Sequence, residues 1–136
     1  WNLRAAEEQD RIQKERIKYE KWIIDGNYQR SLPIRLERAD TVFFFDYPRS
    51  LCLYRALKRI VLNRKRTRPD MGEGCPERFA WEFMKFIWNF NKNNRPGLIA
   101  LLDQAPAGIE IQHFRKPGEA RDYLRALEEQ KEEEVA

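Results

Sequence analysis

Two aspartates, Asp25 and Asp46, each end a short apolar run, which reads WIID over residues 22–25 and TVFFFD over residues 41–46. Continuous apolar runs are typical of strands in parallel sheets, because such strands are covered on both faces. Ligands of open parallel sheets bind beyond the carboxyl ends of the strands, where both aspartates would lie. A carboxylate there can hold Mg²⁺, directly or through water, and Asp25 is our first candidate. The alternative is that both aspartates only form turns or cap helices.

A strongly basic segment follows the second aspartate. Between Tyr47 and Pro69 there is no acidic residue, and the basic residues are Arg49, Arg55, Lys58, Arg59, Arg64, Lys65, Arg66 and Arg68. Arginine binds phosphate oxygens in a bidentate manner that lysine cannot reproduce. The segment and the formal net charge of +4 therefore favour a phosphate-bearing partner, either a small ligand or a nucleic acid. The alternative is a basic helix face that contacts only solvent.

The elements around these residues predict an α/β fold. Residues 2–21 contain good helix formers and no glycine or proline, which predicts a surface helix. Ser31 and Pro33 predict the start of a short helix between the two apolar runs. Pro48 begins a further helix, and later segments predict a short helix from Arg95, a strand at 109–114 and a closing helix from Pro117. We expect one domain, residues 1–136, with a narrow three-stranded parallel sheet flanked by helices.

The segment RFAWEFMKFIWNFNKNN predicts a helix with two apolar stripes. One stripe contains Phe79, Phe83, Phe86, Ile87 and Phe90, and the roughly opposite one contains Trp81, Met84 and Trp88. One stripe should be core. The other needs a cover, which could be the preceding glycine- and proline-rich flap, a nucleobase, a partner chain or a further piece of the same protein.

Several classes of protein are disfavoured by composition. Cys52 and Cys75 form no CxxC pair, and His113 is the one histidine, so neither a disulfide framework nor a zinc site is indicated. No apolar run approaches the roughly 18 residues that a membrane span needs, and no secretion signal opens the chain. We therefore expect a cytoplasmic protein without a membrane partner.

Three stretches, WIIDGNY, RLERADTVFFFDYPRSLCLYRALKR and RTRPDMGEGCPERF, closely resemble the DNA topology modulation proteins, a branch of the adenylate-kinase-like P-loop kinases. The resemblance covers nearly the whole chain. It implies a three-layer α/β fold, ATP as phosphate donor, Mg²⁺, and a lid, which would be residues 66–78. The implied activity is phosphate transfer to a nucleotide or another phosphorylated small molecule.

The resemblance also implies roles for individual residues. Asp25 and Gly26 match the family's recurring DG, which implies that Asp25 lies near the magnesium ion and contacts it through water. Arg30 matches an arginine that holds the acceptor phosphate, although its register is one residue longer here. Arg59 and Arg64 match catalytic arginines at the start of the lid, Arg95 matches one on the helix after it, and Arg68 is a further phosphate clamp.

One departure from the family is large. Its members begin with a strand and the loop GxxGxGK[ST], which cradles the phosphates of ATP, and this sequence contains no such motif. We therefore expect a chain that starts inside the family pattern, lacks its first strand or strands, and is inactive without that loop. We also expect a bare sheet edge beside residues 22–25 or 41–46, or a second copy that fills it.

Two other functions are compatible with the sequence. The basic segment and nearby aromatic residues are compatible with a DNA-binding module, although no known nucleic-acid-binding motif is present. Alternatively, the chain is a non-catalytic kinase-like protein that acts through protein contacts. In that case the Trp81, Met84 and Trp88 face, or the exposed sheet edge, would form a homodimer or bind another protein.

Overall fold

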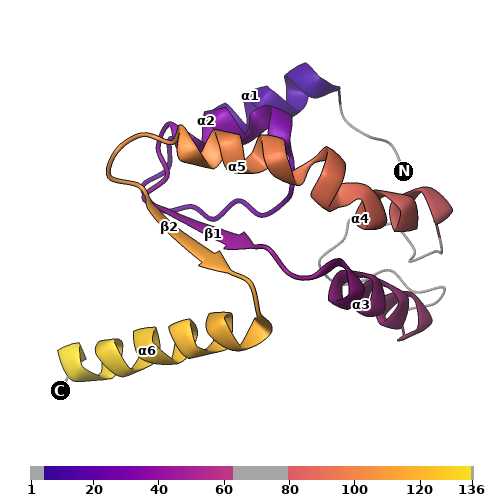
Figure 1. Ribbon diagram of the computed structural model, residues 1–136. Helices are drawn as coiled ribbons and strands as arrows, with labels where there is room; N and C mark the ends of the chain where they lie inside the picture. Colours follow the sequence, from indigo (N-terminus) through magenta and orange to yellow (C-terminus); the bar gives the residue numbers. More distant parts are fainter. Residues whose placement is uncertain (1–4, 63–79, 136) are drawn as a thin grey trace.

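The computed structural model describes residues 5–62 and 80–135, which form helices around a small sheet (Figure 1). In chain order the elements are α1 (Ala6–Arg16), the 3-10 turn η1 (Gln29–Ser31), α2 (Leu32–Leu36), β1 (Thr41–Phe45), α3 (Arg49–Leu62), α4 (Trp81–Asn93), α5 (Arg95–Asp103), β2 (Glu110–Phe114) and α6 (Pro117–Val135). Helices α1, α2 and α5 lie on one side of the sheet, and α6 lies on the other (Figure 1). The predicted mixed α/β class is confirmed.

The sheet in the described part of the chain has two parallel strands, β1 and β2, instead of the three that we expected. Thr41 is opposite Glu110 and Phe45 is opposite Phe114. The strands are joined through α3, α4 and α5, because parallel neighbours need a long crossover. Within the described residues β1 is paired on one side only, so the predicted bare edge beside residues 41–46 is confirmed.

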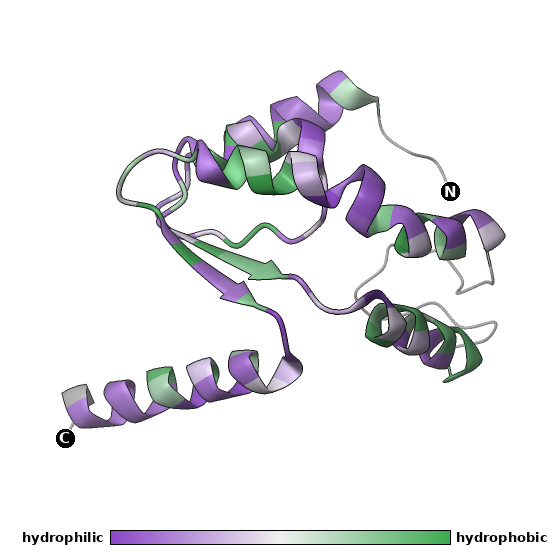
Figure 2. Ribbon diagram, viewed as in Figure 1, coloured by the Kyte–Doolittle hydropathy of each residue, from purple (hydrophilic) through white to green (hydrophobic). Residues whose placement is uncertain are grey.

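The core lies between this sheet and the helices α2 and α5. Its buried members are Leu32 and Leu36 from α2, Phe44 from β1 and Leu102 from α5. Pro33 lies at the start of α2 and Pro96 at the start of α5, where the missing backbone N–H of proline costs nothing. Hydropathy colouring shows apolar residues along β1 and on parts of α5 that face it (Figure 2). This packing fixes the sheet against one layer of helices.

The predicted strand at residues 22–25 is wrong. These residues are not part of any strand, and they run as irregular chain between α1 and η1. A strand is stabilised by hydrogen bonds to a neighbour, and a cavity separates this segment from β1. The N-terminal helix is also shorter than expected, because bonds from Lys18 N to Glu15 O and from Tyr19 N to Arg16 O tighten the chain after Arg16.

The aromatic helix α4 is present, but neither of its stripes is fully buried. Met84 is the buried residue, whereas Trp81 and Trp88 are 58% and 53% exposed. Phe83 and Phe86 also remain largely exposed and stack on each other. The expectation that one whole stripe forms core is therefore wrong within the described residues, which do not include Phe79.

No helix in residues 5–62 and 80–135 combines the length and the apolar character that a bilayer span requires.

Candidate functional site

Asp46 is the centre of a charged cluster at the carboxyl ends of both strands. Its backbone N donates to Phe114 O at 2.8 Å, which extends the pairing of β1 with β2 by one residue. Its carboxylate accepts hydrogen bonds from Arg95 Nε at 2.8 and 3.0 Å and from Arg95 Nη2 at 2.7 Å. His113 Nε2 lies 2.9 Å from Asp46 Oδ2. The sheet thus places Asp46 and His113 side by side, and the first residue of α5 supplies the arginine.

The electrostatics of this cluster favour the ionised carboxylate. The Asp46 side chain is only 10% exposed, and the hydrogen bonds from Arg95 hold its pKa below the usual value. Burial acts in the opposite direction, and the contact with His113 lowers the pKa further. The same pairing raises the pKa of Arg95. The result is a fixed cation at the edge of the sheet where ligands of parallel sheets bind.

Among the described residues, one nitrogen of the Arg95 guanidinium has no acceptor. Its Nε and Nη2 face Asp46, and no described residue accepts a hydrogen bond from its Nη1. The side chain is 36% exposed, so the remaining donor is accessible to a ligand. A guanidinium that is held by one carboxylate loses little side-chain entropy when it binds a phosphate oxygen.

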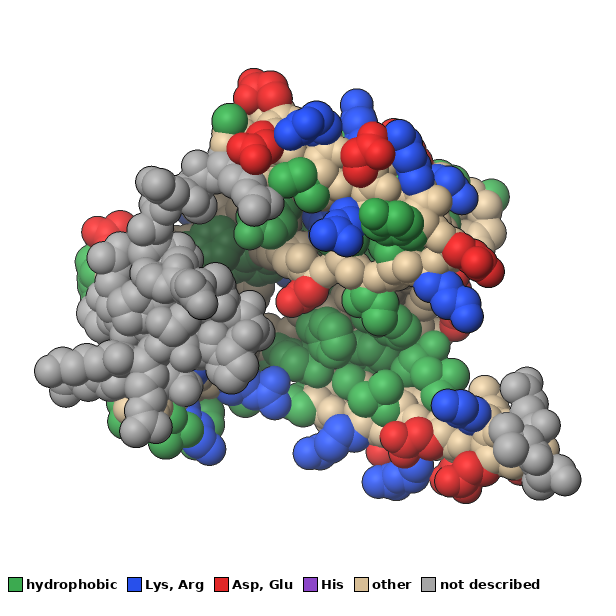
Figure 3. Space-filling view, turned by 180° about the vertical axis from the view of Figure 1, so that it is seen from behind, with side chains coloured by type: hydrophobic (Ala, Val, Ile, Leu, Met, Phe, Trp, Pro, Cys, Tyr) green, Lys and Arg blue, Asp and Glu red, His purple; other side chains and the backbone are tan. Residues whose placement is uncertain are grey.

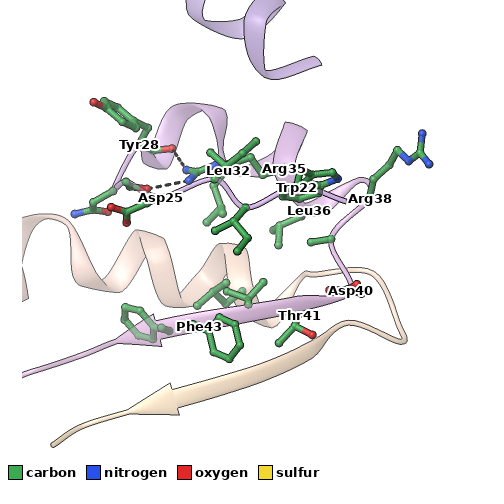
Figure 4. A pocket seen from close by; sticks show the side chains of 18 of the residues that line it. Trp22, Asp25, Tyr28, Leu32, Arg35, Leu36, Arg38, Asp40, Thr41 and Phe43 are labelled. Atoms are coloured by element: carbon green, nitrogen blue, oxygen red, sulfur yellow. Dashed lines mark hydrogen bonds between the residues drawn. The ribbon is translucent and has the colours of Figure 1, made fainter. Parts of the chain in front are cut away.

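A second feature is a cavity of about 830 Å³ between residues 21–29, α2, β1 and α5 (Figure 4). Asp25 and Gly26 lie on its wall, and the Asp25 carboxylate makes no hydrogen bond with a described residue. Arg35 reaches from α2 and donates to Gly26 O and Tyr28 O, both at 2.8 Å (Figure 4). Arg35 therefore ties the chain that follows Asp25 to α2.

The backbone conformation at residue 26 requires glycine. Its φ is +125°, and a Cβ atom there would lie 2.7 Å from the Tyr28 ring. Arg35 is 8% exposed, and burial lowers its pKa, while the charge of Asp25 opposes this effect. Its Nε is buried and has no partner among the described residues. The cavity wall thus carries one carboxylate and one desolvated cation at the same end.

The structure separates the residues that the sequence predicts to act together. Asp25 and Gly26 line the cavity, and Arg95 lies at Asp46. Arg30 instead binds α1, donating to Asp10 Oδ2 at 2.6 Å and to Ala6 O at 3.1 Å. Arg59 does not line the cavity that contains Asp25, so the structure does not bring together these two residues, to which the resemblance assigns roles in the same phosphate transfer.

Other predicted positions lie elsewhere. Arg64, Arg68 and the lid segment 66–78 are outside the described residues. On α3, the guanidinium carbons of Arg49, Arg55 and Arg59 lie 4.3, 5.3 and 5.7 Å from the ring centroids of Trp88, Tyr47 and Phe83, respectively. Part of the basic segment is therefore engaged in cation–π contacts, two of them with α4.

Sequence reasoning missed Arg35 and the role of His113. Arg35 follows Leu32 by three residues and precedes Leu36 by one, so it lies on the buried face of α2. An arginine on the apolar face of a predicted helix indicates a buried cation with a specific partner, and this signal was available in the sequence. His113 is opposite Phe44 in the register, two positions before Asp46, but only the pairing of the two strands reveals this.

Few groups in the described residues could hold a metal ion. No cluster of three or more His, Cys, Asp or Glu side chains occurs among them. The Asp25 carboxylate has no hydrogen-bond partner among the described residues, whereas the Asp46 carboxylate already interacts with Arg95 and His113. Asp25 fits an ion such as Mg²⁺, which takes one or two protein oxygens and completes its shell with water and phosphate.

Compared with known proteins, the chain matches no protein-family model, no curated protein and no solved structure.

Proposed function

We propose that this chain is the phosphate-binding part of a nucleotide phosphotransferase of the P-loop kinase type. The observation that carries the proposal is Arg95, which Asp46 and the sheet hold at the carboxyl ends of two parallel strands, and whose Nη1 has no acceptor among the described residues. The helices on both sides of that sheet support a three-layer arrangement (Figure 1). The sequence resemblance supports the same class of protein.

In this proposal each group has a limited task. Arg95 Nη1 donates to an oxygen of the acceptor or transferred phosphate, while Asp46 keeps the guanidinium oriented. Asp25 would hold Mg²⁺, directly or through water, and the bound ion would neutralise phosphate charge. The tight turn at Gly26, held by Arg35, fixes where Asp25 lies. No side chain acts as a nucleophile, because positioning and charge neutralisation supply most of the rate in phosphoryl transfer.

The residues do not provide a cradle for the phosphates of ATP. The sequence has no glycine-rich loop followed by lysine, which supplies most of those contacts in P-loop enzymes. The chain on its own is therefore proposed to bind a phosphate group but not to transfer one.

A thermal-shift titration tests this function. Inorganic pyrophosphate at ten times its Kd should stabilise the chain by about 1.4 kcal/mol, which raises Tm by about 5 °C. Arg95→Lys keeps the charge beside Asp46 but loses the paired N–H donors of the planar guanidinium, so this variant should lose most of the increase in Tm. Arg38→Lys is the matched control, because Arg38 is exposed and makes no contact with the Asp46 cluster among the described residues. An absent shift, or equal shifts in both variants, would refute the proposal.

A second candidate function is binding to DNA. Arg49, Arg55 and Lys58 are exposed on α3, in the segment that has no acidic residue. Each phosphate that they neutralise should make log K fall with log salt by about 0.9. Fluorescence anisotropy with a labelled duplex at several salt concentrations measures this slope. A flat salt dependence would remove this candidate, and a steep one without any response to pyrophosphate would favour it over the kinase.

A further inference from the structure

The free edge of β1 presents unpaired backbone groups. In the ladder with β2, Glu110 N donates to Asp40 O and Asp46 N donates to Phe114 O, both at 2.8 Å. Strands of a parallel ladder use alternate residues for one neighbour, so the even-numbered residues 40–46 face β2. The N–H and C=O groups of Thr41, Phe43 and Phe45 therefore point to the other edge. No described strand pairs with them.

A second unpaired segment faces that edge. Residues 22–25 run in the same direction as β1 (Figure 1) and make no backbone hydrogen bond with a described residue. Their side chains alternate as in a strand: Trp22 and Ile24 are half-buried, whereas Ile23 is 97% exposed. The segment has the sequence and the alternation of a strand but lacks a neighbour.

The cavity of about 830 Å³ lies between these two segments (Figure 4). Its wall contains residues 22–25 on one side and residues 41–45 on the other, with Leu32, Leu36, Leu98 and Leu102 above. On the opposite face of the sheet, Phe43 and Phe45 are half-exposed. Seen from behind, apolar side chains gather in a hollow between the upper helices and α6 (Figure 3). Charged residues lie near the two ends, Asp25 and Arg35 at one and Arg38 and Asp40 at the other.

We propose that this slot binds one extended, uncharged strand of polypeptide, which pairs with β1 on one side and with residues 22–25 on the other. An extended segment offers backbone donors and acceptors on both of its edges, whereas a helix or an apolar small molecule offers none. The occupant is apolar on both faces, because leucines lie on one side of the sheet and phenylalanines on the other. Five or six residues span such a slot, the usual length of a strand.

A second folded copy of the chain does not fit the same site. Its own β1 edge would bring an attached sheet and helices, and residues 22–25 with α2 already flank the far side of the slot. Pairing on both sides needs a neighbour at about 4.8 Å on each, which only a single strand provides.

Amide hydrogen exchange of the chain, measured by NMR, tests the proposal without any nucleotide. The probe is the capped peptide KVIVIVVK, whose central VIVIVV is the uncharged strand, and its control is KVIPIVVK, which lacks one backbone donor. In the chain alone, Thr41, Phe43 and Phe45 should exchange at least about tenfold faster than Val42 and Phe44. Saturating probe should slow these three amides by about tenfold or more, and the proline peptide should not.

Two variants separate backbone pairing from side-chain packing. Phe45→Pro removes an N–H that faces the slot and leaves the ladder with β2 intact, whereas Phe45→Ala removes only the ring. Affinity for the probe should fall at least about fivefold more in Phe45→Pro than in Phe45→Ala. Retained protection of Val42 and Phe44 shows that a variant is folded. If a variant does not fold, the hydrogen-exchange experiment on the wild-type chain still tests the proposal.

Three results would overturn the proposal. The three amides could already be as protected as Val42 and Phe44 in the monomeric chain. Both peptides could protect them equally. Protection could instead rise with protein concentration, together with a dimer in size-exclusion chromatography, which would make a second copy the occupant.

Discussion

Two segments of this chain follow the same sequence pattern, an apolar run that ends in aspartate, yet they differ in structure. Residues 41–46 form β1, and Asp46 accepts hydrogen bonds from Arg95 and lies beside His113. Residues 22–25 form no strand, and the Asp25 carboxylate is exposed. The two segments differ in what lies beside them: β1 pairs with β2, whereas a cavity borders residues 22–25. An apolar run therefore becomes a strand, and its final carboxylate a fixed group, only when another strand lies alongside.

The largest expected effect comes from removing an apolar side chain in each segment. Phe44→Ala deletes a buried core ring and should lower the free energy of unfolding by about 3–5 kcal/mol. Ile23→Ala deletes a side chain that is 97% exposed and should change it by less than about 0.5 kcal/mol. Urea unfolding measures both. Similar costs would mean that residue 23 is buried in solution and would break the comparison.

A smaller effect is expected at the fixed carboxylate. Asp46→Asn removes the charge that Arg95 faces, and because Arg95 is partly exposed the loss should be about 1–3 kcal/mol at neutral pH. Asp25→Asn, which disturbs no described hydrogen bond, is the matched control and should cost less than about 0.5 kcal/mol. Chemical unfolding of both variants gives the two values.

The same carboxylate should make stability depend on pH. The pKa of Asp46 is lowered by folding, so its contribution is fully present above the pKa of the unfolded chain, about 3.9. It is lost as pH falls through the lower value of the folded protein. The stability difference between wild type and Asp46→Asn should therefore shrink steadily below about pH 4. A difference that stays constant down to the folded pKa would contradict this assignment.

Gly26→Ala tests how firmly the turn after Asp25 is held. Alanine must adopt a φ of +125° and displace the Tyr28 ring, so we expect a loss of about 1–2 kcal/mol. Gly108→Ala is a suitable control, because φ is also positive there but no atom lies within 4 Å of the added Cβ. A smaller loss at Gly26 than at Gly108 would show that residues 22–28 rearrange freely.

The smallest effect on stability is expected at the exposed rings of α4. Trp88 contacts Arg49, so Trp88→Glu exchanges a cation–π contact for an ion pair and should change stability by less than about 0.5 kcal/mol. If the Trp81 and Trp88 surface mediates self-association, the variant should elute later than wild type in size-exclusion chromatography. An unchanged elution volume would exclude that surface as the dimer contact.

Much of the fold follows from local signals in the sequence. Pro33, Pro48 and Pro117 mark the starts of α2, α3 and α6 to within one residue, because proline fits the first turn of a helix. The continuous apolar run at 41–45 predicts β1 correctly for the same kind of local reason. The failures are at segments whose structure depends on a distant neighbour, as at residues 22–25.

The candidate site was predictable in part. Asp46 was expected at the carboxyl end of the sheet and Arg95 as a catalytic arginine on the helix after the lid, but their direct pairing across 49 positions was not expected. Arg30 carries the charge expected of a phosphate clamp, yet Asp10 on α1 is close enough to bind it. Arg35, which the sequence analysis passed over, lies on the buried face of α2 and reaches the turn after Asp25.

The sequence by itself determined where the helices begin, which runs are apolar enough to be strands, and the strong local excess of positive charge. These properties depend on backbone restrictions and side-chain types over a few residues. Tertiary structure alone decided which arginine meets which aspartate and which apolar run gains a strand partner. Such pairings join residues far apart in the chain, and their energies depend on distances that only the packed fold sets.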